Sequence, residues 1–247
     1  MKRFWQKEWH GIRFDSFATL SATRLAGSEF YSAFYRQLFR RYSGYEDLEA
    51  EWRSDKRDIA EWLARRVRSG ARVLSVGAGL GYVEHCLNAA QAGVFELHAQ
   101  DFAGDALAWL RKELPDSRIH CTLEQQIRGG PYDLIYLSAV DYALDTGELI
   151  AMLDALRGQL RADGSAILIS ASFWEPPPLT RKLKEAAKDA VKSILGALGL
   201  YHRGQFWGWQ RSQAEYRDLF LSAGYRTIAD GFIQTPSQRI YYIEGKN

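Results

Sequence analysis

Three glycines at alternate positions, Gly77, Gly79 and Gly81, are the residues whose spacing points most clearly to a chemical task. They follow the β-prone run 72–76 and precede a helical pattern that begins at Tyr82. Glycine is needed where a chain turns sharply and a ligand approaches the backbone without a Cβ in the way. The free N–H groups of the helix beyond the turn attract a carboxylate or a phosphate. The pattern therefore predicts a ligand-binding loop between a strand and a helix.

An acid one strand further along narrows the choice of ligand. Dinucleotide-binding loops have the spacing G-x-G-x-x-G, which would need a glycine where this chain has Tyr82; the spacing here is G-x-G-x-G. Asp101 lies 22 residues after Gly79, at the predicted end of the next strand. An acid at that place can accept hydrogen bonds from both hydroxyls of a ribose. The loop and the acid together indicate a ligand that contains adenosine.

Strands and helices alternate around this loop in a way typical of a parallel sheet that is covered on both faces. The predicted strands are 72–76, 94–99, 117–122, 133–139, 165–170, 226–232 and 239–244. The predicted helices are 28–42, 46–68, 82–90, 105–114, 147–160, 180–198 and 212–223. The last two strands have no helix between them, so they must pair antiparallel. We therefore expect a doubly wound α/β fold with an antiparallel C-terminal hairpin.

Five segments, LSVGAGLG, HAQD, YDLIYLSAVDYAL, LRADGSAILIS and SAGYRTIADGF, resemble those of the class I S-adenosylmethionine-dependent methyltransferases. The resemblance covers residues 46–247 and implies a Rossmann-like sheet of seven mostly parallel strands there. We expect residues 1–45 to form an N-terminal helical and aromatic cap segment. We expect the helical insertion 172–211, after the fifth strand, to act with that segment as a lid over the cofactor and the methyl acceptor, because both are rich in aromatic residues. The alternative is that the aromatic residues of the insertion pack into a small core of their own.

The resemblance also implies a site for S-adenosyl-L-methionine. Its residues would be Gly77, Ala78, Gly79 and Gly81 at the methionine part, Asp101 at the ribose, Phe102, Thr122 and Leu123 near the adenine, and Ser138 at the sulfonium and the acceptor. One position departs from the family. Where this chain has Ser75, the family commonly has an acid that helps to organise the loop and the amino group of the cofactor.

Methyl transfer asks little of the protein, because the sulfonium is already activated and alignment does much of the work. A hydroxyl acceptor benefits in addition from a general base. The candidates are Asp141, at the mouth of the fourth strand, and His10 and His202, in the aromatic-rich flanking segments. The alternative is a helix or turn cap for Asp141 and a structural role for each histidine. Some members of the family that this chain resembles bind a magnesium ion through acids after the fourth strand and just beyond. Asp141 and Asp145 are present here, but no Asp-Asn pair follows in the region of the fifth strand, so we expect no metal ion.

Charge and hydropathy indicate whether the protein binds nucleic acid or a membrane. The net charge of +2 is small for a general nucleic-acid binder, and no apolar run approaches the roughly 18 residues of a membrane span. We therefore expect a cytoplasmic protein without a nucleic-acid partner. The predicted helix 180–198 is basic, with Arg181, Lys182, Lys184, Lys188 and Lys192. It is either a solvated face or a contact to an anionic polymer, a lipid-linked substrate or a membrane surface.

Taken together, these features favour an S-adenosylmethionine-dependent methyltransferase that acts on a hydroxyl of a small molecule or a glycan. Two alternatives stay open. One is a methyltransferase that acts on protein or RNA. The other is a methyltransferase-like protein that binds the cofactor without activity, for which Ser75 is the only hint.

Overall fold

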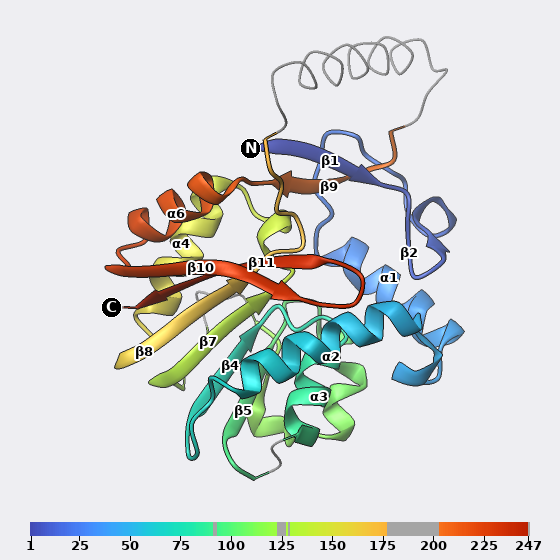
Figure 1. Cartoon of the computed structure of the whole chain (residues 1–247). Helices are drawn as coiled ribbons and strands as arrows, with labels where there is room; N and C mark the ends of the chain where they lie inside the picture. The colour runs from blue at the N-terminus through green and yellow to red at the C-terminus, as the bar shows by residue number, and fades with distance from the viewer. Residues whose placement is uncertain (91–92, 123–126, 128, 177–202, 247) are drawn as a thin grey trace.

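A seven-stranded sheet runs through the centre of the molecule (Figure 1). This computed structural model describes residues 1–90, 93–122, 127, 129–176 and 203–246. The strands of the sheet are β4 (Arg72–Val76), β5 (Glu96–Gln100), β6 (Ile119–His120), β7 (Tyr132–Ser138), β8 (Leu160–Ile169), β10 (Thr227–Gln234) and β11 (Arg239–Lys246). Their spatial order is β10-β11-β8-β7-β4-β5-β6. The predicted doubly wound sheet with its antiparallel hairpin is confirmed.

The direction of the strands defines where a ligand can bind. β4 pairs parallel with both β5 and β7, and β7 pairs parallel with β8. β11 runs antiparallel between β8 and β10. The chain builds the sheet outward from β4 to β6 and then returns to add β7 on the other side of β4. In such open sheets the crevice beyond the carboxyl ends, at the point where the order reverses, is the usual ligand site.

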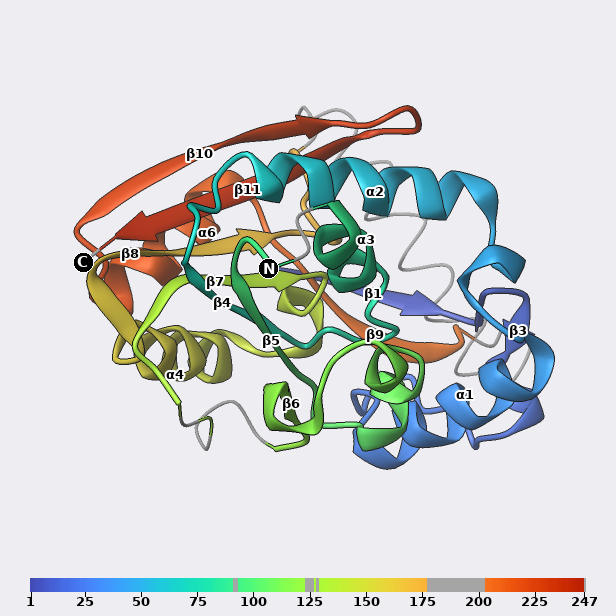
Figure 2. The same cartoon turned by 90° about the horizontal axis from the view of Figure 1, so that it is seen from below.

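Two layers of helices cover the sheet (Figure 2). The helices are α1 (Ser28–Arg41), α2 (Ala50–Ala64), α3 (Tyr82–Ala90), α4 (Thr146–Arg157) and α6 (Gln213–Ser222). The helices α2 and α3 pack on one face, and α4 and α6 on the other. Capping interactions start α4 and α6. The side chain of Asp145 accepts the backbone N–H of Glu148, whose carboxylate accepts the N–H of Asp145. The carboxylate of Glu215 accepts the backbone N–H and the hydroxyl of Ser212.

Alternate residues of β4 face the two helical layers, as the period of two in a strand requires. Val73 belongs to the core with Leu63 of α2 and Val83 of α3. Leu74 belongs to the opposite core with Leu153 of α4. All four of the aliphatic residues Val73, Leu63, Leu74 and Leu153 are fully buried, and each such side chain contributes about 1.5–3 kcal/mol relative to exposure.

The first residues form strands as well as the predicted helix at 28–42, which is α1. β1 (Lys2–Gln6) pairs antiparallel with β9 (Gln205–Gln210), and β2 (Glu8–Trp9) forms a short hairpin with β3 (Ile12–Arg13). The sequence pattern did not indicate β1, because its partner lies about 200 residues away in the chain. The predicted helix 180–198, with its basic residues, lies outside the described residues.

Local structure departs from the sequence pattern at the β6 edge of the sheet. The predicted helix 105–114 is instead two short 3-10 turns, η3 (Gly104–Ala108) and η4 (Leu110–Lys112). The predicted strand 117–122 is reduced to the two residues of β6, which pairs with β5 at the edge of the described sheet. Further 3-10 turns are η1 (Phe14–Ser16), η2 (Tyr45–Asp47), η5 (Asp116–Arg118) and η7 (Asp141–Ala143). No helix within the described ranges is long and apolar enough to cross a membrane.

Candidate functional site

A cavity of about 320 Å³ lies at the carboxyl ends of β4, β5 and β7. This is the edge of the sheet where the strand order reverses and where a ligand is expected. The residues from Gly77 to Gly81 form part of its wall, together with Asp101, Phe102 and Ser138. The structure thus brings most of the predicted cofactor residues to one cavity.

The three loop glycines are required by the fold of the loop itself. Gly77, Gly79 and Gly81 have φ values of +67°, +57° and +76°, in the left-handed region that L side chains rarely adopt. A Cβ on Gly77 would lie 2.3 Å from Cγ2 of Val140. A Cβ on Gly79 would lie 3.1 Å from the hydroxyl of Tyr35. A side chain at Gly79 would therefore crowd α1. The sequence did not indicate that α1 packs against the loop.

Two side chains at the end of β5 hold the loop in place. The backbone N–H of Gly77 donates to Oε1 of Gln100 at 3.0 Å. The N–H of Gly79 donates to Oδ2 of Asp101 at 2.8 Å, and the N–H of Ala103 donates to Oδ1 of the same carboxylate at 2.8 Å. Asp101 thus ties the loop to the end of β5, and it also lines the cavity.

Of the residues predicted to lie near an adenine, Phe102 lines the cavity and Thr122 does not. Phe102 lines the cavity and meets the ring of Tyr31 edge-on, with 5.8 Å between the ring centroids. The carbonyl of Thr122 accepts a hydrogen bond from Nε2 of Gln100, and Thr122 is not among the described residues that line the cavity. Leu123 lies outside the described residues. A flat ring could therefore be held by Phe102 from one side.

Asp141 lies behind the wall of the cavity rather than in it. The side chain is fully buried, and Oδ2 accepts hydrogen bonds from Ser170 at 2.7 Å, from Ser172 at 2.7 Å and from Tyr216. Arg211 donates to the carbonyl of Asp141 at 2.5 Å. This geometry supports the alternative interpretation of Asp141, a structural carboxylate that ties β7, β8 and α6 together, and does not support a general base.

His10 lies one layer away from the cavity. The ring is buried, its Nδ1 bonds to Glu49, and it stacks on Trp9 at 4.9 Å between ring centroids. Burial lowers the pKa of His10, against the opposing effect of Glu49. Trp9 and Trp52 stand between His10 and the cavity, since both line it and both contact the ring. The placement favours a structural histidine. His202 lies outside the described residues.

Aromatic side chains that the sequence analysis did not single out form much of the remaining wall. The contributors are Tyr31 and Tyr35 of α1, Trp52 of α2, Tyr142 of η7 and Trp207 of β9. The hydroxyl of Tyr31 donates to that of Tyr142 at 3.4 Å, and the rings of Tyr142 and Trp207 stack at 5.8 Å. Burial raises the pKa of Tyr142 to about 12. These phenols are therefore neutral at physiological pH.

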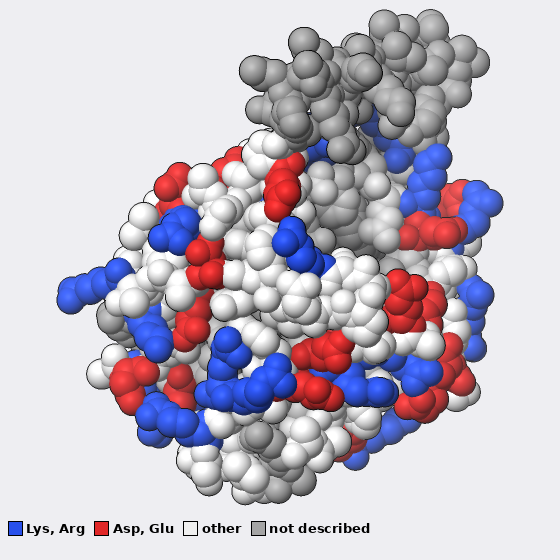
Figure 3. Space-filling view, viewed as in Figure 1, with Lys and Arg blue, Asp and Glu red and all other residues white. Residues whose placement is uncertain are grey.

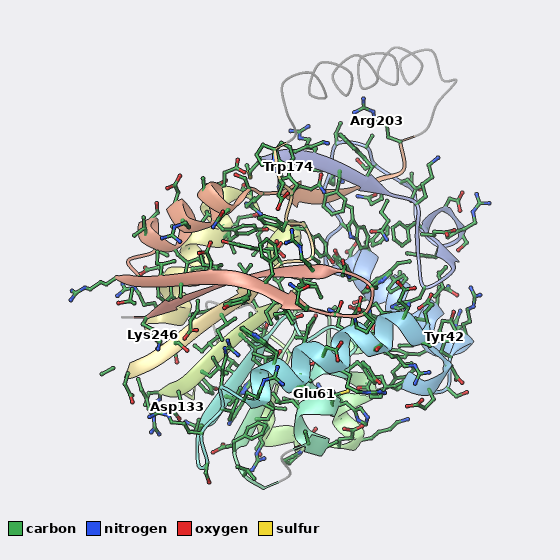
Figure 4. All side chains as sticks on the ribbon, viewed as in Figure 1. Tyr42, Glu61, Asp133, Trp174, Arg203 and Lys246 are labelled. Atoms are coloured by element: carbon green, nitrogen blue, oxygen red, sulfur yellow. The ribbon has the colours of Figure 1, made fainter. Side chains whose placement is uncertain are left out.

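The β1–β9 ribbon covers one side of the cavity, because Phe4 of β1 and Trp207 of β9 both line it. Figure 4 labels Trp174 and Arg203, which stand beside this ribbon. The ring of Trp174 lies 5.6 Å from Nζ of Lys2, and the guanidinium of Arg203 lies 4.6 Å from the ring of Trp5. The described ends of the insertion therefore rest on the N-terminal strand.

Two charged side chains in the wall were also missed. Glu84, in the first turn of α3, is 1% exposed and accepts a hydrogen bond from Ser75 at 2.5 Å. Lys56 of α2 is half-buried, and its Nζ lies 3.4 Å from Oγ of Ser138. A second cavity of about 160 Å³ adjoins the first and shares Lys56, Trp52 and Ser138 with it. The sequence offered one signal for Glu84, a lone acid among the apolar residues of a short helix.

The chain is similar to known proteins in its structure. No protein-family model and no curated protein matches the chain. Solved structures match it over most of its length at 16–18% sequence identity. Magnesium protoporphyrin IX methyltransferase from Synechocystis PCC 6803, with bound S-adenosylhomocysteine, is 18% identical with a TM-score of 0.61, covering 89% of this chain and 97% of that one.

Two further structures share the fold over a part of their own length. Human N-acetylserotonin methyltransferase, in complex with S-adenosylmethionine, is 16% identical with a TM-score of 0.55, covering 90% of this chain and 57% of that one. A methyltransferase of calicheamicin biosynthesis, in its S-adenosylhomocysteine-bound form, is 17% identical with a TM-score of 0.58, covering 89% and 58%. The chain therefore spans little more than half of these two proteins. With its strand order and its glycine loop, the chain has the fold of the class I S-adenosylmethionine-dependent methyltransferases.

Proposed function

We propose that the chain is an S-adenosylmethionine-dependent methyltransferase that modifies a hydroxyl group of a small molecule. The observation that carries the proposal is the cavity at the reversal point of the sheet, where the glycine loop meets the buried carboxylate of Asp101. The structural neighbours with bound S-adenosylmethionine or S-adenosylhomocysteine support it, since they share this fold. Two of the neighbours carry the name O-methyltransferase, which supports a hydroxyl as the acceptor.

The residues in the wall suit the cofactor. Asp101, fixed by two backbone N–H groups, would accept hydrogen bonds from the ribose hydroxyls. Phe102 would pack on the adenine, and the loop from Gly77 to Gly81 would pass the methionine part. When bound, the cofactor supplies a methyl group activated by its sulfonium. The chain would contribute binding, alignment of the acceptor and exclusion of water, which are the main requirements of this transfer.

The acceptor side favours a small, flat molecule. Its wall contains Phe4, Trp9, Tyr142 and Trp207, and rings of this kind stack on planar groups. The β1–β9 ribbon would act as a cover that keeps water out and positions the acceptor. A polymer would need a charged track instead, and on the face seen in Figure 3 positive and negative side chains are interspersed.

Binding and transfer can be tested separately. Calorimetry with S-adenosylhomocysteine should give saturable binding at one site, and a variant with Gly79→Leu should lose it. Gly44→Leu is the matched control, because Gly44 has extended backbone and no atom within 4 Å of a built Cβ. Transfer from methyl-labelled S-adenosylmethionine to a panel of phenols and sugars would then identify the acceptor. A folded parent protein that binds no S-adenosylhomocysteine would refute the proposal; binding without transfer to any hydroxyl would favour a binding protein.

A further inference from the structure

Glu84 is a buried carboxylate with one oxygen left over. Its Oε1 accepts hydrogen bonds from Ser75 at 2.5 Å and from Tyr136 at 2.7 Å. Its Oε2 is buried and has no hydrogen-bond partner among the residues that the structure describes. The side chain belongs to the wall of the main cavity. Leaving a buried charged acceptor unpaired is costly. A donor group on a molecule in the cavity would supply the hydrogen bond that Oε2 lacks.

Lys56 is a cation in the wall of the same cavity. No carboxylate of the described residues lies within 4.0 Å of its Nζ; the contacts are Oγ of Ser138 at 3.4 Å and the ring of Trp52 at 6.0 Å. Burial lowers the pKa of Lys56, against the attraction of Glu84, Asp55 and Asp141. The ammonium group therefore stands where an anion in the cavity would pair with it.

The register of the strands brings the residues that contact the two charges to one face of the sheet. Ser75 of β4 is directly opposite Tyr136 of β7, and both hold Glu84. Ser138, which touches Lys56, follows Tyr136 by two residues and so lies on the same face of the sheet. The acid and the base thus approach one edge of the cavity from α3 and α2. An α-amino acid carries an ammonium and a carboxylate on one carbon, so it matches such a pair.

We propose that Glu84 and Lys56 bind the amino-acid end of the cofactor, the Glu84 carboxylate taking its ammonium group and the Lys56 ammonium taking its carboxylate. The inference rests on the proposed function and deepens it. It also explains how the chain can have Ser75 at the position where the resemblance implied an acid. The small serine leaves room for the carboxylate of Glu84, which reaches the same place from the helix after the loop.

The test compares two ligands that differ in the amino-acid end alone. S-adenosylhomocysteine carries it, and 5′-methylthioadenosine has the same nucleoside and thioether without it. Calorimetry should show that Glu84→Gln and Lys56→Met each weaken S-adenosylhomocysteine about 10- to 100-fold, the effect of losing a charged hydrogen bond. Both variants should bind 5′-methylthioadenosine within about twofold of the parent. Gln retains an oxygen that can accept from Ser75 and Tyr136, so the first variant should fold.

Matched controls separate the outcomes. Glu113→Gln also removes an acid that contacts α3, through His85 at 2.7 Å, but lies away from the cavity and should change neither affinity. Ser75→Asp added to Glu84→Gln should restore part of the lost affinity. Unchanged affinity for S-adenosylhomocysteine in both single variants would overturn the inference, as would an equal loss for both ligands, which would mean that Glu84 merely holds the loop. A parent that binds neither ligand would refute the proposed function itself.

Discussion

Replacing Asp101 by asparagine tests whether one carboxylate both holds the loop and binds the ribose. The carboxylate accepts one backbone N–H on each oxygen, from Gly79 and Ala103, both at 2.8 Å. Asparagine keeps one acceptor oxygen and turns an NH2 group toward the other N–H, so one hydrogen bond is lost. A bond to a charged group is worth about 1.5–3 kcal/mol. In a protein of this size, that loss should lower Tm by about 3–12 °C.

The same variant should weaken S-adenosylhomocysteine, because the amide can accept from fewer ribose hydroxyls. A loss of about 1.5–3 kcal/mol corresponds to a Kd that is about 10- to 150-fold higher. Differential scanning calorimetry and isothermal titration would measure the two effects. Asp105→Asn is the control, since Asp105 forms a surface ion pair with Arg36 at 3.1 Å and should shift stability by less than about 0.5 kcal/mol. A folded Asp101→Asn protein with the parent's Kd would refute the ribose role, and one with the parent's Tm would refute the role in the loop.

Three further predictions concern the surroundings of the site. Gly208→Ala should destabilise the fold by about 1–3 kcal/mol, because the new Cβ would lie 2.0 Å from the carbonyl oxygen of Tyr142; an unchanged urea midpoint would contradict this. Asp141→Asn should lower Tm yet leave the pH profile of methyl transfer unchanged, whereas loss of a basic limb in that profile would restore Asp141 as the base. Stability should also rise with pH, because the unfolded chain protonates three of its histidines more readily than the folded one does. Burial lowers the pKa of these three, His10, His98 and His120. Their contribution is complete above about pH 6.5, the ordinary histidine pKa, and is lost as the pH falls through the lowered values. Urea denaturation at pH 7.5 and 5.5 would measure it, and equal free energies of unfolding would count against the effect.

The parts of the fold that the sequence predicted are those that local patterns determine. The strand predicted at 72–76 has the same bounds as β4, because β-prone residues end abruptly at the first loop glycine. The helix predicted from Ser212 begins with a capping box that can be seen in the sequence, SQAE. The antiparallel hairpin followed from the short connection between β10 and β11. In each case the deciding contacts lie within a few residues of one another.

The parts that the sequence did not predict depend on contacts between distant segments. Glu84 matters because α3 turns it toward Ser75 and the end of β7, and nothing in its own neighbours shows that direction. Tyr35 matters because α1 packs over the loop and brings its hydroxyl close to Gly79. Asp141 was assigned by its position at a strand end, which is shared by residues inside the cavity and residues behind its wall. The end of a strand predicts where the site lies. The direction of each side chain, which the sequence does not show, decides whether that residue lines the cavity.

The β1–β9 ribbon explains why both chain segments outside the sheet are rich in aromatic residues. Pairing of β1 with β9 brings Phe4 and Trp207 to one wall of the cavity, although they are about 200 residues apart in the chain. Trp207 also packs on Phe14 and Tyr142, with ring centroids 4.8 and 5.8 Å apart. The same rings therefore belong to a packed aromatic core and also line the cavity. A methyl acceptor that stacks on this wall would be held by groups whose positions are already fixed by the fold, which reduces the entropy cost of aligning it with the cofactor.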